Sequence, residues 1–141
     1  MMNKSVKLGI QGRPDVPPRL FDLVPRYIEK YGYKDCLFAG KVNKQWVKYD
    51  GKKFYEITNS ISYGLLKLGV KKGDRIALIA NNAPEWNMID FAIQQVGAIC
   101  IPIYPTISHD DYKYIFNHSE ASIAFFTNKH LYSKVADIIA N

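Results

Sequence analysis

Cysteine is scarce in this chain of 141 residues, which contains only Cys36 and Cys100. Two thiols so far apart form neither a metal-binding pair nor a redox pair, and they do not indicate a disulfide-stapled secreted domain. Cys100 stands in an apolar run, which predicts a small buried side chain. Long hydrophobic runs are also missing, since the longest uncharged apolar stretch, residues 96–104, is too short to cross a bilayer. Lysines interrupt the apolar residues near the N-terminus, so there is no signal-peptide core. These absences predict a cytoplasmic protein without a transmembrane segment.

Several motifs that carry chemistry are missing as well. The sequence contains neither the GxGxxG turn of dinucleotide-binding folds nor a GxxxxGK[ST] phosphate loop. No serine lies in a GxSxG elbow, and no cysteine has an evident histidine partner. His109, His118 and His130 have no second type of ligand at helical or hairpin distance, so a metal site is not predicted. The adjacent Asp110 and Asp111 are better explained as acids at a helix start than as a catalytic pair.

What the sequence does contain is typical of a globular domain, with 48% apolar and 23% charged residues. The net charge is +6, and the charged residues are unevenly distributed. Residues 1–72 carry 15 basic and six acidic side chains, whereas residues 73–141 carry four basic and seven acidic side chains. A basic patch favours phosphates, acidic lipid headgroups or nucleic acid, although a lysine-rich face is more often simply solvated. No nucleic-acid motif accompanies the charge, so we predict no nucleic-acid partner. The basic patch leaves peripheral contact of the protein with a membrane as an open alternative. The clustered lysines are Lys41, Lys44, Lys48, Lys52 and Lys53.

The first 49 residues have no regular alternation. Residues 1–20 are rich in proline and glycine and predict an extended arm. Apolar spacing over residues 19–31 predicts a short amphipathic helix. Two strand-like runs, residues 36–42 and 45–49, are separated by a polar pair and predict a hairpin.

From residue 50 onward, short continuous apolar runs alternate with amphipathic helical patterns. This alternation predicts an α/β fold whose sheet is mainly parallel, with helices on its faces. Polar residues before the helical patterns predict N-caps at Asp50, Asn82, Ser108 (with Asp111 completing a capping box) and Asn128. The strands are expected at residues 75–80, 98–104 and 122–126, and the helices near 52–68, 84–96, 109–118 and 129–139.

Three segments carry a resemblance to a known family. They are LLKLGVKKGDRIALIANNAPEW (65–86), FAIQQVGAICIPIYPTIS (91–108) and YIFNHSEASIAFF (114–126). In order and spacing they resemble the N-terminal part of adenylate-forming, AMP-binding enzymes, specifically bacterial long-chain fatty acid–CoA ligases. The resemblance covers residues 46–135. The chain ends abruptly at a helical pattern, so we expect residues 21–141 to be the truncated N-terminal subdomain of such a ligase.

The resemblance implies a reaction for the whole enzyme. A fatty carboxylate attacks ATP, usually with Mg²⁺, to give an acyl-adenylate and pyrophosphate, and coenzyme A then displaces AMP to give the thioester. The parts that carry this chemistry lie further along the chain in that family. We therefore expect no catalytic residue here, no activity of the fragment alone and no cofactor bound to it. The competing interpretation is a stand-alone, non-catalytic binding or scaffold module, since fold does not fix function.

The resemblance also implies candidate binding residues. In relatives, the turn after the PIYPT-type strand and the region after the next strand lie towards the coenzyme A channel. The corresponding positions here are Tyr104, Pro105, Lys129 and Lys134, and the two lysines are the candidates for coenzyme A phosphates. The ordinary alternative is that both lysines are solvated. A fragment cut from a larger fold exposes a sheet edge and apolar faces, so we also expect self-association as a two-fold dimer.

Overall fold

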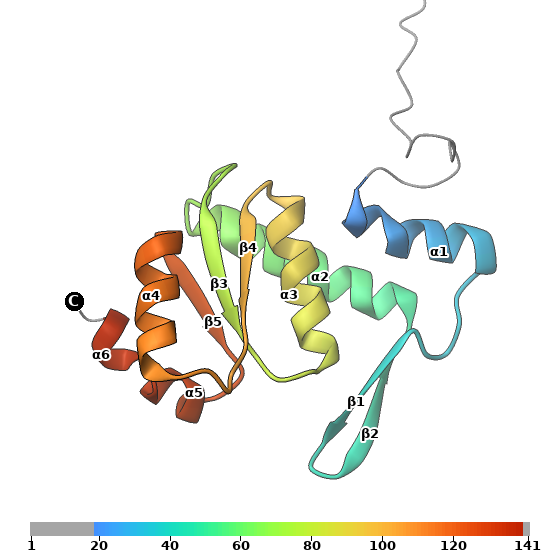
Figure 1. Ribbon diagram of the computed structural model, residues 1–141. Coiled ribbons are helices and arrows are strands. Elements are labelled where there is room, and N and C mark those ends of the chain that lie inside the picture. Colours follow the sequence, from blue (N-terminus) through green and yellow to red (C-terminus); the bar gives the residue numbers. More distant parts are fainter. Residues whose placement is uncertain (1–18, 140–141) are drawn as a thin grey trace, which may run out of the picture.

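The computed structural model describes residues 19–139 and contains a three-stranded sheet between helices, with a separate hairpin (Figure 1). The sheet strands are β3 (Arg75–Ile79), β4 (Ile99–Ile103) and β5 (Ile123–Phe126), in the order β4-β3-β5. Both pairings are parallel, with Ala77 opposite Ile101 on one side and Ala124 on the other. The predicted parallel sheet is confirmed. The predicted arm lies almost wholly outside the described residues.

The central strand is the most deeply buried part of the sheet. Ile76, Ala77, Leu78 and Ile79 have no exposed surface, as expected for a parallel strand with helices on both faces. The flanking strands are only partly covered because each lies at an edge of the sheet. The strand expected at residues 122–126 is present as β5, and each of its residues is half-buried.

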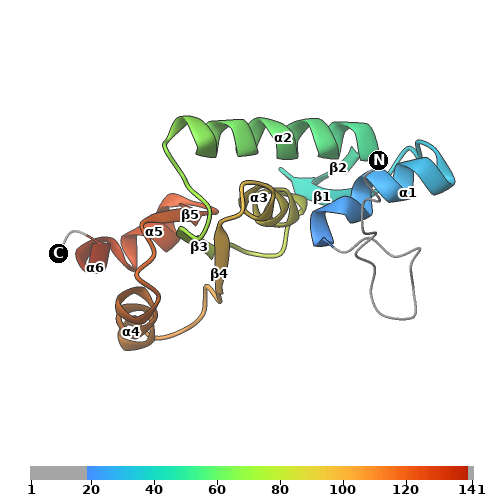
Figure 2. The ribbon, with the colours of Figure 1, turned by 90° about the horizontal axis from the view of Figure 1, so that it is seen from above.

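Helices cover the two faces of the sheet (Figure 2). On one face lie α2 (Gly51–Lys67) and α3 (Pro84–Gln95), and on the other lies α4 (His109–Ser119). Alternate residues of β3 divide between these faces. Ile76 packs in the cluster that contains Leu65 and Ile93, and Ile79 packs in the cluster that contains Tyr112 and Val135.

The predicted helix over residues 129–139 is wrong, because the chain forms two short helices, α5 (Lys129–Ser133) and α6 (Ala136–Ile139). The Ser133 hydroxyl donates to the His130 carbonyl at 2.8 Å, and α5 ends at Ser133. Val135 then enters the core between the two helices with no exposed surface. A continuous apolar stripe did not reveal this break.

Most of the predicted helix starts are confirmed. The side chains of Asp50, Ser108 and Asn128 accept hydrogen bonds from backbone N–H groups of α2, α4 and α5, and Asp111 completes the capping box with Ser108. Asn82 is not the cap of α3. Ala83 occupies that position without a side-chain bond, and Pro84 follows in the first turn, where its missing N–H costs nothing.

The N-terminal helical pattern forms a short 3₁₀ turn, η1 (Leu20–Asp22), followed by α1 (Leu23–Tyr31). The predicted hairpin is confirmed as β1 (Phe38–Val42) and β2 (Gln45–Tyr49). Its two-residue turn, Asn43 and Lys44, has φ values of 50° and 66°, the left-handed geometry that matches the twist of the strands.

The base of the hairpin is fixed against the start of α3. The Tyr49 hydroxyl donates to Glu85 Oε1 at 2.8 Å. A Cβ added at Gly40 would lie 2.7 Å from Pro84 Cδ, so a larger residue at this position would separate the hairpin from α3. The inner face of the hairpin joins the core at Phe38, which stacks on Phe54 of α2.

One edge of the parallel sheet contains a proline. The Ile99 N–H donates to the Asp74 carbonyl at 2.8 Å, so alternation along β4 turns the N–H groups of Ile99, Ile101 and Ile103 toward β3. Pro102 therefore has its nitrogen on the outer side, where no ladder bond within the sheet is lost.

Candidate functional site

A cavity of about 830 Å³ lies at the carboxyl ends of β3 and β4, beside the base of the hairpin. Ligands of open α/β folds bind at the carboxyl ends of parallel strands, so a binding site is expected at this position. The walls come from β1, from the connection between β3 and α3, from the first turns of α3 and from the segment that follows β4. The lining residues are Phe38, Ala39, Ala80, Asn81, Asn82, Ala83, Pro84, Trp86, Asn87, Pro102, Ile103, Tyr104, Pro105 and Thr106.

The lining decides what this cavity can do. It contains no carboxylate, imidazole or lysine, so it has no group that exchanges protons near neutral pH. Aromatic and proline side chains provide apolar walls, and the amides of Asn81, Asn82 and Asn87 provide donors and acceptors. Such a surface can bind and orient a partner or ligand, and it supplies no acid or base of its own.

The structure brings most of the candidate binding residues to one rim of this cavity. Tyr104 and Pro105 line it, and Tyr104 is 79% exposed. The Lys134 ammonium group donates to the Pro105 carbonyl at 3.4 Å, a long hydrogen bond that places this cation at the rim. Lys129 is exposed at the start of α5 and does not line the cavity.

Two further hydrogen bonds hold the rim, and sequence reasoning missed both. The Tyr112 hydroxyl of α4 donates to the Tyr104 carbonyl at 3.1 Å. The Asn81 N–H donates to the Thr127 hydroxyl at 3.0 Å, which ties the segment after β3 to the residue after β5. The only signal in the sequence was position, since Asn81 and Thr127 each follow closely after a strand.

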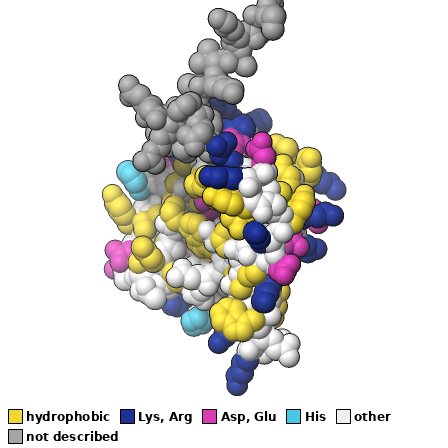
Figure 3. All heavy atoms as spheres, turned by 90° about the vertical axis from the view of Figure 1, so that its right-hand side faces the viewer, with side chains coloured by type: hydrophobic (Ala, Val, Ile, Leu, Met, Phe, Trp, Pro, Cys, Tyr) yellow, Lys and Arg dark blue, Asp and Glu magenta, His cyan; other side chains and the backbone are white. Residues whose placement is uncertain are grey.

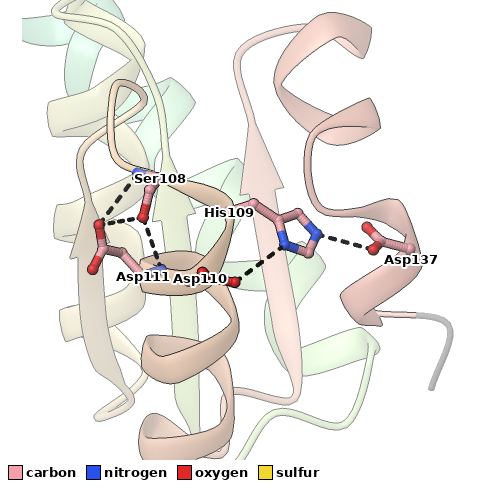
Figure 4. A network of polar contacts seen from close by, with 5 residues as sticks. All are labelled: Ser108, His109, Asp110, Asp111 and Asp137. Atoms are coloured by element: carbon pink, nitrogen blue, oxygen red, sulfur yellow. Dashed lines mark hydrogen bonds and ion pairs between the residues drawn. The ribbon is translucent and has the colours of Figure 1, made fainter.

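A second polar group, at the start of α4, superficially resembles a nucleophile–histidine–carboxylate set (Figure 4). His109 Nε2 lies 2.9 Å from Asp137 Oδ2, and Nδ1 lies 4.0 Å from Asp110 Oδ1. The Ser108 hydroxyl instead donates to Asp111 Oδ2 at 2.6 Å. Because Ser108 bonds to Asp111 and both histidine nitrogens face acids, His109 is not placed to activate the serine. The group joins α4 to α6 and caps α4.

Replacing His109 with alanine is expected to raise the pKa of Asp137 toward its ordinary value. The hydrogen bond from His109 is the main reason why the pKa of Asp137 is lowered. A carboxyl whose folded pKa is depressed stabilises the fold above its unfolded pKa, and this contribution is lost as pH falls through the folded pKa. A pH titration of the Asp137 carboxyl carbon by NMR would measure the shift. An unchanged pKa in the variant would contradict the contact.

Cys100 is half-buried, not buried as predicted, because β4 is an edge strand. Burial, with a further contribution from nearby Asp90, raises the pKa of its thiol to about 12. The thiolate is the reactive form of cysteine, so a pKa this high keeps Cys100 inert near neutral pH.

At pH 8, Cys100 is expected to react with a disulfide reagent far more slowly than exposed Cys36. A rise in the thiol pKa from an ordinary 9.0 to about 12 reduces the thiolate fraction roughly 1,000-fold. Labelling of the Cys36→Ser and Cys100→Ser variants would follow each thiol separately. Equal rates in the folded variants would contradict the prediction, and unfolding in urea serves as the control that both thiols can react.

Comparison with known proteins decides the family. Residues 25–140 match the family described as AMP-binding enzyme, which covers most of the chain. The chain belongs to the AMP-binding enzyme family. The chain is similar to the long-chain-fatty-acid–CoA ligase FadD15 of Mycobacterium bovis, with 42% identity over 62 residues, which are 44% of this chain and 10% of the relative. It is also similar to fatty acyl-CoA synthetase A of Dictyostelium discoideum, with 32% identity over 101 residues, 71% of this chain and 15% of the relative. The resemblance inferred from the sequence is confirmed.

Solved structures show the same fold. An anthranilate CoA ligase, AuaEII, in complex with anthranoyl-AMP matches with a TM-score of 0.70 and 21% identity, over 84% of this chain and 22% of that one. A fatty acid AMP ligase from Legionella pneumophila matches with a TM-score of 0.67 and 18% identity, over 78% and 20% of the two chains. The chain spans only 10% to 22% of the length of these curated relatives and of a long chain acyl-CoA synthetase of Arabidopsis thaliana.

AMP-binding ligases use ATP, Mg²⁺ and coenzyme A, and the described part of this chain does not fit the first two. Among residues 19–139, no group of three or more His, Cys, Asp or Glu side chains could hold a metal ion. The cavity has no cation among its lining residues to neutralise a triphosphate. Lys134 brings a cation to the rim of the cavity at Pro105. Within the same described residues, no helix combines the length and the hydropathy needed to cross a membrane.

Proposed function

We propose that this chain is the N-terminal structural subdomain, residues 21–141, of a cytoplasmic acyl-CoA ligase that activates long-chain fatty acids. In the whole enzyme, the fatty carboxylate attacks the α-phosphate of ATP, releasing pyrophosphate and forming an acyl-adenylate. The thiol of coenzyme A then attacks the acyl carbon, AMP leaves, and the thioester forms. The family match over residues 25–140 carries this proposal. The names of the relatives, which include long-chain-fatty-acid–CoA ligases, support the substrate class.

The role of this subdomain is to position a surface and not to perform chemistry. Its cavity has apolar walls and amides but no acid or base, and the mobile lid and phosphate loop of the family have no counterpart motif in the sequence. The chain alone should therefore give no ATP–pyrophosphate exchange with a long-chain fatty acid above a no-protein control. Exchange above that control would mean that the chemistry lies in these residues after all.

Within the whole enzyme, we assign Lys134, and with it Lys129, to the phosphates of coenzyme A. Lys134 carries its charge to the cavity rim at Pro105, and Lys129 begins the helix that ends just before Lys134. Reversing both charges in the full-length ligase should raise the KM for coenzyme A while leaving the KM for ATP unchanged. Lys113→Glu, a change at an exposed lysine on α4, is the control. An unchanged KM for coenzyme A would remove this assignment.

The isolated chain is further expected to form a two-fold dimer through β5. This strand has an outer edge without a partner in the described chain, beside a groove of about 270 Å³ whose apolar lining includes Phe116, Ile123 and Ile138. A specific interface of this kind should bury more than roughly 1,000 Å² in total. Sedimentation equilibrium over a wide concentration range tests it. A strictly monomeric chain that also fails to bind a hydrophobic dye would contradict it.

A further inference from the structure

The hairpin β1–β2 presents two chemically different faces. Residues paired directly across two strands share a face. Phe38 pairs with Tyr49, and this face rests on the core. Lys41 pairs with Trp46 and Ala39 with Lys48, so these four residues share the opposite face, where each of them is exposed. We call these four residues, together with the turn residue Lys44, the outer face of the hairpin.

The apolar part of the outer face is dominated by one side chain near the end of the hairpin. Trp46, the second residue of β2, is 65% exposed. Val42, which pairs with Gln45 on the other face of the hairpin, is 50% exposed at the end of β1. Figure 1 shows that the hairpin projects away from the helices and the sheet, so no other described element covers its end. An exposed tryptophan on a projecting strand pair needs an explanation, because a tryptophan side chain buries a large apolar area when it finds a partner.

The charge of the outer face has one sign. Lys41, Lys44 and Lys48 are exposed, and residues 36–49 contain no acidic side chain. Two acids at the base of the hairpin are engaged elsewhere, since Asp50 Oδ1 accepts a hydrogen bond from Lys53 N at 2.7 Å and Glu85 accepts one from the Tyr49 hydroxyl. Figure 3 shows lysine or arginine side chains beside an exposed hydrophobic group at the lower end of the molecule, where the hairpin projects.

Lysine and tryptophan are also held together on this face. The Lys41 ammonium group lies 5.0 Å from the centre of the Trp46 ring, within the range of a cation–π contact. A tryptophan flanked by lysines is the combination found where proteins meet the headgroup level of a bilayer, with the ring at the boundary and the cations among the phosphates. Nucleic-acid surfaces instead place several aromatic rings along a basic groove. The outer face has a single ring on a convex projection.

We propose that the outer face of the β1–β2 hairpin docks on an anionic lipid surface, with Trp46 at the headgroup boundary and Lys41, Lys44 and Lys48 among the lipid phosphates. The hairpin is suited to this role because its base is fixed to α3 through Tyr49 and through the close approach of Gly40 to Pro84. Docking therefore orients the whole subdomain. The proposal does not depend on the ligase function proposed above.

The test measures partitioning of the full 141-residue chain onto vesicles by cosedimentation. The chain should bind vesicles of mixed phosphatidylglycerol and phosphatidylcholine, bind much less to pure phosphatidylcholine, and be released by salt. Each lysine near an anionic surface contributes about fivefold to partitioning. Partitioning onto the anionic vesicles should therefore fall about 100-fold in the triple variant Lys41→Gln/Lys44→Gln/Lys48→Gln. The matched control is Lys67→Gln/Lys71→Gln/Lys113→Gln, which changes the net charge equally at exposed positions elsewhere. Its partitioning onto the anionic vesicles should fall far less.

A second pair of variants tests the ring. Trp46→Ala should reduce partitioning by about tenfold, since the ring loses its apolar contact with the bilayer. Tyr63→Ala, which removes a side chain that is 71% exposed on α2, should have little effect. Circular dichroism checks that every variant is folded.

Three outcomes would overturn the proposal. These are an absence of binding to the anionic vesicles, equal losses in the hairpin and control variants, and binding of a single-stranded oligonucleotide through the same lysines without binding to vesicles. The last result would assign the outer face to nucleic acid.

Discussion

Replacing Phe54 with alanine is expected to lower the free energy of unfolding by about 3–5 kcal/mol. Phe54 has no exposed surface, and it joins three elements. Its ring stacks on Phe38 of the hairpin at 4.6 Å between centroids and meets Phe91 of α3 edge-on at 5.8 Å. Removing it loses the apolar contacts of the ring and leaves a cavity that these two rings cannot close without moving the hairpin.

Urea denaturation followed by circular dichroism would measure this loss. Tyr55→Ala is the matched control, because it removes an adjacent aromatic side chain that is 39% exposed and should cost much less. A loss below about 1 kcal/mol in the Phe54 variant would show that the hairpin and α3 hold together without it, which would contradict the role given to this ring.

Tyr112→Ala is expected to be comparably destabilising, by about 3–5 kcal/mol, on the opposite face of the sheet. Tyr112 is 1% exposed and packs in the same cluster as Ile79, Leu131 and Val135. Its hydroxyl also donates to the Tyr104 carbonyl at 3.1 Å, so the variant loses both ring packing and a bond that holds the cavity rim. The same urea titration measures the effect.

Tyr112→Phe separates the two contributions. It keeps the ring and removes only the hydrogen bond, so its cost should be about 1 kcal/mol. Phe54 and Tyr112 lie in separate core clusters, so the losses of Phe54→Ala and Tyr112→Phe should add in the double variant. If Tyr112→Phe were as damaging as Tyr112→Ala, the hydrogen bond and not the packing would dominate.

The parts of the fold that could be predicted from the sequence are those set by local rules. The run at Ile76–Ile79 indicates a strand buried on both faces because every position is apolar, and Asp50, Ser108 and Asn128 each bind the N–H groups of the turn that comes after them. Asn82 is also a polar residue just before a helical pattern, but it does not cap α3. Pro84 begins α3 one residue after Ala83, and this selected a different cap position.

The features that could not be predicted depend on tertiary contacts. The break between α5 and α6 follows from the need to bury Val135, which the apolar stripe alone does not distinguish from a continuous helix. The half-exposure of Cys100 and β5 follows from the strand order, which the sequence leaves open. At the site, Tyr104 and Pro105 could be placed by their position after a strand. The bond from Asn81 to Thr127 joins residues 46 apart in the chain and has no local signature.

The proline in β4 limits how copies of this chain could assemble through their sheets. An open-ended fibre needs two sheet edges, each able to accept a further strand. The outer side of β4 offers a nitrogen without hydrogen at Pro102, so strand addition is confined to β5. When two copies pair their β5 strands about a two-fold axis, the open edge of each sheet is paired with that of the other copy. Edge-to-edge association of this sheet therefore closes at a pair, and concentrated solutions should yield dimers and not filaments.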